Sequence, residues 1–132
     1  MATFHRNGGN FGPEWVATFK RNGGSFAPDY AGGVHEGEDC RTAALRELSE
    51  ETGYIAKELT LLGRFYPSPG TRGSTVHVYV THSVEAGTPS PDEHEIIEVV
   101  LMPWDNVLKL VLAEQAVDAS LAYAVLRYGA TR

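Results

Sequence analysis

Residues 32–54 read GGVHEGEDCRTAALRELSEETGY, and this stretch decides how the rest of the chain is interpreted. Asp39 suits the N-cap of a helix, because its side-chain oxygens accept hydrogen bonds from the free backbone N–H groups of the first turn. The alanine and leucine residues that follow are good helix formers. Gly53 is well placed to end the helix, since glycine readily adopts the left-handed conformation common at this position. The pattern therefore predicts a helix over residues 39–52.

Three glutamates gather on one side of this helix. At 100° per residue, Glu47, Glu50 and Glu51 fall within an arc of roughly 100°. Like charges at this spacing destabilise a helix by roughly 0.2–0.5 kcal/mol per pair, and the macrodipole disfavours anions in its second half. A hard cation such as Mg²⁺ reverses this penalty, because it takes oxygen ligands from carboxylates and substrate phosphates. From the spacing alone, a metal site and a solvated acidic face are equally good interpretations.

The residues around the three glutamates favour the metal site. Gly32, Glu38, Arg46 and Gly53 complete the pattern G-x5-E-x7-R-E-L-x-E-E-x-G, which an apolar residue follows. This pattern resembles the signature of the Nudix hydrolases at every fixed position. The resemblance implies an α/β/α sandwich with a mixed sheet, on which residues 32–54 pack as a loop, a helix and a loop. It also implies hydrolysis of a nucleoside diphosphate linked to another moiety, with Mg²⁺ or sometimes Mn²⁺ as cofactor.

The resemblance assigns metal ligands to the helix. Glu47 and Glu51 are expected to be the main ligands, with Glu50 as a third, and the carbonyl oxygen of Ala31 is a further candidate. Metal ions that bridge pyrophosphate oxygens neutralise their charge and make a bound water more acidic. Metal-dependent pyrophosphate hydrolysis is therefore compatible with carboxylates that can bind such ions.

The other signature residues are expected to shape the site rather than bind the metal. The resemblance implies that Arg46 orients the glutamates through ion pairs. Glu38 braces the loop against the helix or contacts the metal through water. Gly32 allows a tight turn before the helix, and Gly53 allows one after it.

Beyond the signature, three segments are similar to the ADP-ribose and ADP-sugar pyrophosphatases. They are AGGVHEGE at residues 31–38, FYPSPG at residues 65–70 and IIEV at residues 96–99. In that subgroup a glutamate of the acidic loop before the last segment acts as catalytic base, so Glu93 is the first candidate and Glu95 the second. A solvent-exposed acidic turn is an equally good interpretation of both residues.

The expected substrate is ADP-ribose-like. Ser68, Gly70 and Arg72 are candidates for substrate binding, because they lie in or beside the FYPSPG segment and a guanidinium pairs well with phosphate oxygens. A solvated loop arginine is an equally good interpretation of Arg72. Two alternatives to a nucleotide-sugar hydrolase stay open. One is hydrolysis of a nucleoside triphosphate or a dinucleotide, and the other is a module that binds nucleotide sugars without turnover.

Hydrophobic patterns predict the elements around the helix. Strands are expected at residues 59–66 and 96–102, and a helical region over residues 104–128 with a break near residues 114–115. Residues 75–81 alternate, with Val76, Val78 and Val80 on one face and polar or aromatic residues on the other, which predicts a half-buried strand.

The first 30 residues contain a repeat. ATFHRNGGNFGPE at residues 2–14 recurs as ATFKRNGGSFAPD at residues 17–29. Short strands are expected at residues 2–5 and 15–20, each before an Asn-Gly turn. This segment does not resemble the Nudix hydrolases, so the sheet is expected to keep an open edge that invites pairing with another chain. We therefore predict a homodimer with N-terminal segments exchanged or packed across the two-fold axis.

Length and composition set the broad class. The 132 residues suit one domain over the whole chain, and 42% are hydrophobic. The net charge of −6 argues against a nucleic-acid partner, whereas a small nucleotide substrate needs only local neutralisation. No apolar run reaches the roughly 20 residues that span a bilayer. A single cysteine, Cys40, and no recognisable secretory signal favour a cytoplasmic location.

Overall fold

The structure, a computed structural model, describes residues 34–67, 70, 75–90, 99, 101–115 and 119–132, and the backbone alone of residues 15–21. The expected strand at residues 2–5 lies outside the described residues. Of the expected strand at residues 96–102, only residues 99, 101 and 102 are described, and these have no regular structure.

Eight elements follow one another along the chain. They are β1 (Trp15–Arg21), α1 (Cys40–Thr52), β2 (Tyr54–Ala56), β3 (Thr60–Phe65), β4 (Thr75–Thr81), β5 (Val84–Ala86), α2 (Trp104–Leu112) and α3 (Ala119–Thr131). The expected helix and the expected strands at residues 15–20, 59–66 and 75–81 are thus confirmed within one or two residues. The short strands β2 and β5 were not predicted, because three residues carry too little periodicity to reveal them.

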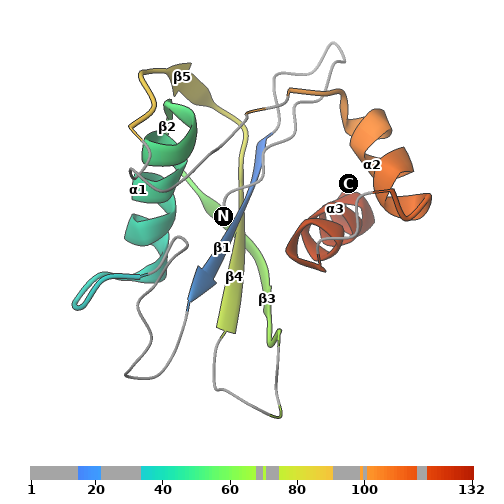
Figure 1. Cartoon of the computed structure of the whole chain (residues 1–132), viewed down its shortest axis with the longest axis horizontal. Helices are drawn as coiled ribbons and strands as arrows, with labels where there is room; N and C mark the ends of the chain where they lie inside the picture. Colours follow the sequence, from blue (N-terminus) through green and yellow to red (C-terminus); the bar gives the residue numbers. More distant parts are fainter. Residues whose placement is uncertain are drawn as a thin grey trace.

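The strands form two antiparallel sheets. β4 lies at the centre of a three-stranded sheet with β1 on one side and β3 on the other, and β2 pairs with β5. Figure 1 shows the three-stranded sheet between α1 and the pair formed by α2 and α3. The layered α/β architecture that the resemblance implies is confirmed, whereas all described strand pairs are antiparallel, so no parallel pair of the expected mixed sheet lies among the described strands.

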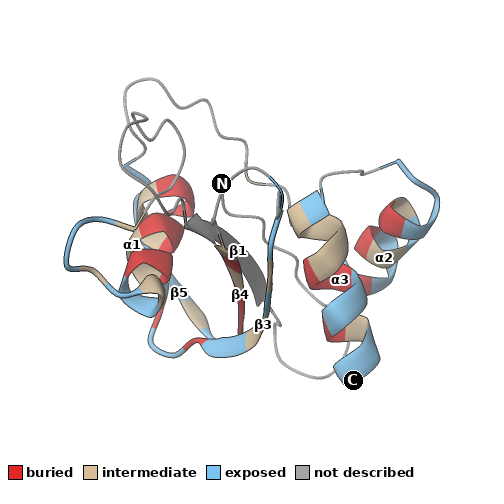
Figure 2. Ribbon diagram, turned by 90° about the horizontal axis from the view of Figure 1, so that it is seen from below, coloured by how far each residue is buried: buried red, intermediate tan, exposed pale blue. Residues whose placement is uncertain are grey.

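Two hydrophobic clusters hold the layers together. Val76, Val78 and Val80 of β4 pack under α2 and α3 with Trp104 among their neighbours. On the opposite face, Tyr79 packs against residues of α1 that include Leu48. Figure 2, coloured by burial, shows buried residues on the helices of both outer layers. The prediction of a half-buried β4 is therefore wrong, because helices cover both faces of this central strand.

The helical region after residue 103 is broken where the sequence indicates. α2 ends at Leu112, and Glu114 has a positive φ angle of 54°, which a helix interior does not tolerate. α3 then begins at Ala119 and runs three residues beyond the predicted end. No helix among the described residues is both long and apolar enough to cross a membrane.

Candidate functional site

α1 is held at both ends by its own neighbours. Asp39 Oδ1 accepts hydrogen bonds from the backbone N–H groups of Arg41 and Thr42, each at 2.9 Å. The bond from the Thr42 N–H is the main reason that the pKa of Asp39 lies below its usual value. Gly53 has a φ angle of 74°, and its N–H donates to the carbonyl of Ser49 at 2.9 Å. Asp39 and Gly53 therefore fix where α1 begins and ends.

Two of the three helix glutamates are buried. Glu47 is 7% exposed and Glu51 is 3% exposed, although Ala44 and Leu48 form the apolar contact with the sheet. Burial is the largest cause of the raised pKa of Glu47, and the nearby charge of Glu51 acts in the same direction. The ion pair with Arg46 opposes both effects. α1 thus carries two buried carboxyl groups one turn apart.

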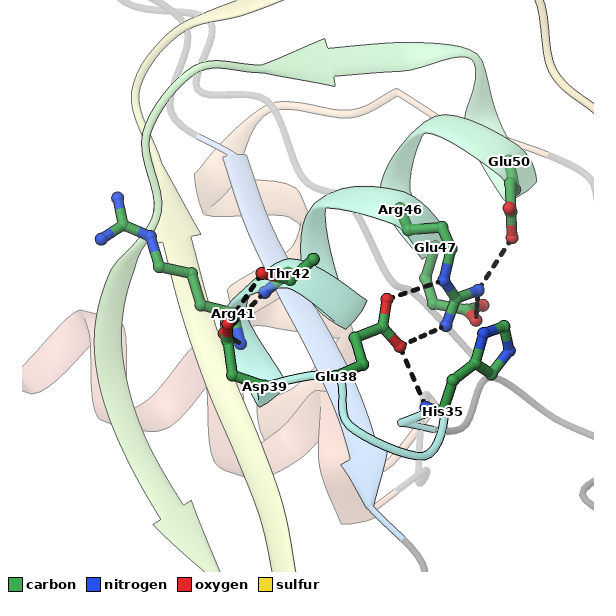
Figure 3. A network of polar contacts seen from close by, with 8 residues as sticks. All are labelled: His35, Glu38, Asp39, Arg41, Thr42, Arg46, Glu47 and Glu50. Atoms are coloured by element: carbon green, nitrogen blue, oxygen red, sulfur yellow. Dashed lines mark hydrogen bonds and ion pairs between the residues drawn. The ribbon is translucent and has the colours of Figure 1, made fainter.

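Arg46 connects the signature loop to the helix (Figure 3). Its Nε and Nη2 atoms donate to the two carboxylate oxygens of Glu38 at 3.0 and 3.1 Å. Its Nη1 atom donates to Glu50 Oε2 at 3.0 Å and also to Glu47 Oε1. The hydrogen bond to Glu38 is the largest cause of the raised pKa of Arg46. One guanidinium therefore contacts three carboxylates.

Glu38 completes this network on the loop side. Its Oε2 atom also accepts the backbone N–H of His35 at 3.0 Å, within a turn closed by a bond from the Glu38 N–H to the His35 carbonyl. The hydrogen bond from Arg46 is the main cause of the lowered pKa of Glu38. These contacts place Glu38 where the sequence predicts a brace between loop and helix.

The described carboxylates fit a hard divalent cation in part. Mg²⁺ in proteins commonly takes one or two carboxylates and completes its shell with water and substrate phosphates. Glu47 and Glu51 offer such a pair. Glu50, whose side chain is 43% exposed, contacts Arg46. Among the residues with described side chains, no group of three or more Asp, Glu, His or Cys is arranged to hold a metal ion.

Several predicted site residues fall in segments that are not among the described residues. These are Ala31, Gly32, Ser68, Arg72, Glu93 and Glu95, which lie outside the described residues. Gly70 is described and exposed, with open space around the position of an added Cβ atom.

Sequence reasoning missed one segment near the glutamates. Residues 87–90 contact the carboxyl end of α1, where the Ser90 N–H donates to the Glu50 carbonyl at 2.7 Å. The two partners are separated by 39 residues in the chain, so no local pattern points to the contact. The only available signal was a turn-forming Gly and Pro in this segment.

Comparisons with known proteins identify a family and several relatives of this chain. A family model described as NUDIX domain matches residues 5–123. The match includes most of the N-terminal repeat, so the expectation that this segment does not resemble the family is wrong. The chain is 43% identical over 97 residues to an ADP-ribose pyrophosphatase of Bacillus subtilis (strain 168), a match that covers 72% of this chain and 52% of that protein.

Two further relatives are more distant. A methanol dehydrogenase activator of Bacillus methanolicus is 34% identical over 97 residues, covering 72% of this chain and 52% of that protein. An ADP-sugar pyrophosphatase of Mus musculus is 36% identical over 85 residues, covering 59% and 38%. The chain therefore spans about half or less of the length of these relatives.

Proposed function

The chain belongs to the Nudix family, and from this premise we propose that it hydrolyses the pyrophosphate bond of a nucleoside diphosphate linked to a sugar. An ADP-ribose-like molecule is the proposed substrate class, because two of the relatives are an ADP-ribose pyrophosphatase and an ADP-sugar pyrophosphatase. The observation that carries the proposal is the buried pair Glu47 and Glu51, next to the ion pairs of Arg46.

We assign the divalent metal, Mg²⁺ or Mn²⁺, to this pair of carboxylates. Glu47 and Glu51 are the proposed main ligands, with Glu50 and the Ala31 carbonyl as additional ones. Such a metal supplies charge neutralisation at the pyrophosphate oxygens and a more acidic water. Burial supports the assignment, because two buried carboxylates one turn apart are costly unless positive charge neutralises them, and a divalent cation supplies such charge.

Arg46 has a positioning role in this proposal. By contacting Glu38, Glu47 and Glu50 together, it fixes the loop against α1 and limits the rotamers of two proposed ligands. Pre-organised ligands accelerate a reaction because they need no rearrangement when charge develops. Glu93, or failing that Glu95, is the proposed base that takes a proton from the attacking water.

We further propose a homodimer that uses the β1 side of the sheet, and a cytoplasmic location. The outer edge of β3 is covered by α3, since Arg127 Nε donates to the Leu62 carbonyl at 3.3 Å and the Tyr123 hydroxyl donates to the Arg64 carbonyl at 3.4 Å. Among the described strands, β1 pairs only with β4. An edge of this kind is where a second chain adds.

Product formation from a panel of substrates tests the proposed reaction. ADP-ribose, other nucleotide sugars, dinucleotides and nucleoside triphosphates are incubated with the chain and Mg²⁺, and with its Glu51→Gln variant. We expect ADP-ribose-like molecules to give the highest kcat/KM, and Glu51→Gln to lower it by at least about 100-fold. Glu114→Gln, an exposed change after α2 on the other side of the sheet, is the matched control.

The panel also separates the alternatives. Preferred turnover of triphosphates or dinucleotides would replace the sugar-linked substrate but keep the chemistry. Binding of ADP-ribose with no turnover of any substrate would overturn the proposed reaction in favour of a binding module. Full activity of Glu51→Gln would overturn the assignment of the metal ligands.

A further inference from the structure

Thr52, the last residue of α1, has a buried side chain that bridges the helix and the strand after it. The residue is 8% exposed. Its hydroxyl donates to the Leu48 carbonyl, one turn earlier, and accepts the backbone N–H of Tyr54 at 3.1 Å. Leu48 is fully buried, and Tyr54 is the first residue of β2. One hydroxyl group therefore joins the last turn of α1 to β2.

This hydroxyl takes the place of a backbone bond that is common at helix ends. In the Schellman motif, the N–H of the residue after a glycine in the left-handed conformation donates to a helix carbonyl. Gly53 has this conformation, and its own N–H donates to the Ser49 carbonyl. The Tyr54 N–H donates to the Thr52 hydroxyl instead. A hydroxyl accepts one bond while it donates another, so Thr52 connects this N–H to a helix carbonyl indirectly.

The end of α1 is also held by backbone donors from a segment far along the chain. The Glu50 carbonyl accepts the Ser90 N–H at 2.7 Å, and the Gly53 carbonyl accepts the Gly87 N–H at 2.6 Å. Every residue except proline supplies such an N–H. The bridge at Thr52 instead requires a hydroxyl close to the backbone, which threonine and serine offer. The chemical identity of residue 52 therefore decides whether this bridge forms.

The bridge lies next to a proposed metal ligand. Glu51 directly precedes Thr52 and is itself 3% exposed. It lies between the Glu50 carbonyl, which Ser90 holds, and the Thr52 hydroxyl, so the backbone on both sides of it is fixed. Groups that support a metal ligand orient it, and their loss typically costs about 10- to 100-fold in metal affinity or activity.

We propose that Thr52 is a positioning residue for Glu51: by joining the last turn of α1 to β2, its hydroxyl limits the orientations of the Glu51 carboxylate and so raises the affinity for the divalent cation. The inference rests on the proposed function, because it takes Glu51 as a metal ligand. Thr52 itself touches neither metal nor substrate in this proposal. Its role differs from local stabilisation of the turn, which would affect Tm alone.

Hydrogen exchange tests whether the bridge exists in solution. Thr52→Val keeps the branched shape of the side chain and removes the hydroxyl, whereas Thr52→Ser keeps the hydroxyl. We expect the Tyr54 amide to exchange at least about tenfold faster in Thr52→Val than in the unmodified chain, because it loses its acceptor. In Thr52→Ser its rate should stay within about twofold. Equal exchange in all three proteins would overturn the proposal, whatever the enzymatic activity.

Binding of Mn²⁺ alone tests whether the bridge acts on the metal site. The metal-induced rise in Tm gives the affinity of each protein without substrate. Mn²⁺ affinity is expected to fall by about tenfold in Thr52→Val and to stay within about twofold in Thr52→Ser. Thr52→Ala, with a better helix former, should behave as Thr52→Val does and replaces it if that variant does not fold.

Thr81→Val is the matched control for this measurement. Thr81 is also a buried threonine, and its hydroxyl donates to the Ser83 carbonyl in the turn after β4. We expect Thr81→Val to leave Mn²⁺ affinity within about twofold. An equal loss of affinity in Thr81→Val, or a lower Tm of metal-free Thr52→Val with unchanged affinity, would overturn the positioning role.

A double-mutant cycle tests whether Thr52 acts through Glu51. In a Glu51→Gln background the carboxylate is already lost, so Thr52→Val should lower Mn²⁺ affinity by less than about twofold further. A tenfold loss in both backgrounds would show that Thr52 acts elsewhere and would overturn the proposal.

Turnover separates this inference from the proposed function. In Thr52→Val, kcat/KM should fall at low Mn²⁺ and largely recover at saturating Mn²⁺, because a weaker site fills at higher concentration. An unmodified chain that hydrolyses no substrate, with Mn²⁺ affinities in the expected order, would overturn the proposed function and support the inference. An active unmodified chain whose Mn²⁺ affinity does not change in Thr52→Val would overturn the inference and leave the proposed function standing.

Discussion

At the scale of single residues, Arg46 is where the loop, the helix and the proposed ligands meet. Its two-point contact with Glu38 requires the planar fork of a guanidinium, which a lysine does not reproduce. Its contact with Glu47 compensates a carboxylate that burial disfavours. The same side chain therefore contributes to stability and to the arrangement of the site.

Replacing this arginine is expected to cost stability as well as activity. Arg46→Ala leaves a buried carboxylate without this ion pair and should lower the free energy of unfolding by roughly 1–3 kcal/mol. Arg46→Lys keeps the charge, so its free energy of unfolding should lie between those of the unmodified chain and Arg46→Ala. Arg41→Ala is the control, because Arg41 is exposed on the same helix and its side chain points away from Glu38 in Figure 3. Urea unfolding measures the difference, and equal losses for Arg46→Ala and Arg41→Ala would contradict the prediction.

Asp39 gives the chain a pH dependence of known sign. Hydrogen bonds from Thr42 and Arg41 lower the pKa of Asp39 in the folded state. A lowered pKa means that the cap contributes fully above the pKa of the unfolded chain, about 4, and that its contribution is lost as the pH falls through the lower folded value. Asp39→Asn keeps a capping side chain that does not titrate.

The measurement compares Tm from pH 7 to pH 2.5 in the two proteins. Below pH 4, Tm is expected to fall more steeply in the unmodified chain than in Asp39→Asn. Asp105→Asn, in the first turn of α2, controls for the removal of one carboxylate elsewhere. Parallel curves for the unmodified chain and Asp39→Asn would show that the cap does not respond to pH as stated.

At the scale of elements, α3 lies close to β3 because β3 has a glycine at the contact. A Cβ atom at Gly63 would collide with the hydroxyl oxygen of Tyr123. The β3–β4 register shifts between Leu61 and Gly63, so an irregularity of the strand coincides with the contact. Tyr123 also packs against Phe65 with the rings tilted and their centroids 4.7 Å apart. The packing of α3 thus depends on one position without a side chain.

Gly63→Ala is expected to destabilise the chain, because the tyrosine must leave its place on the strand edge. Overpacking of this kind typically costs roughly 1–3 kcal/mol, and the low end applies since the obstructing atom ends a side chain. Tyr123→Phe removes that atom, so Gly63→Ala should cost less in a Tyr123→Phe background. Chemical unfolding of the four proteins of this cycle provides the test. Simple additivity would show that the close contact is absent.

The elements also show what the sequence predicts well and where it fails. Asp39, Gly53 and the alternation of β4 carry local signals, and the helix and strand they predict are confirmed. Burial of Glu47 and Glu51 was not predicted, because helix periodicity gives the direction of a side chain but not what covers it. The contact of residues 87–90 with the end of α1 was missed because the bonded residues are distant in sequence.

At the scale of the whole molecule, the sheet has one edge covered by α3 and another formed by β1. The signature covers residues 32–54 only, whereas the family model matches residues 5–123 and so includes β1. A second chain could join the β1 edge only through the backbone N–H and C=O groups of β1 that do not point toward β4. Its register with β4 runs from Trp15 opposite Thr81 to Arg21 opposite Thr75.

Proline substitutions at neighbouring positions of β1 distinguish its two sides. In an antiparallel strand, the N–H groups of successive residues point to opposite edges, so only one of Ala17 and Thr18 donates toward β4. Ala17→Pro and Thr18→Pro should therefore behave differently. Proline at the residue whose N–H points toward β4 removes a hydrogen bond between the strands and lowers Tm at every protein concentration. Proline at the residue whose N–H points away from β4 leaves these bonds intact and converts a dimer to a monomer. Light scattering at micromolar concentration measures the second effect, and a monomeric unmodified chain would overturn the dimer through β1.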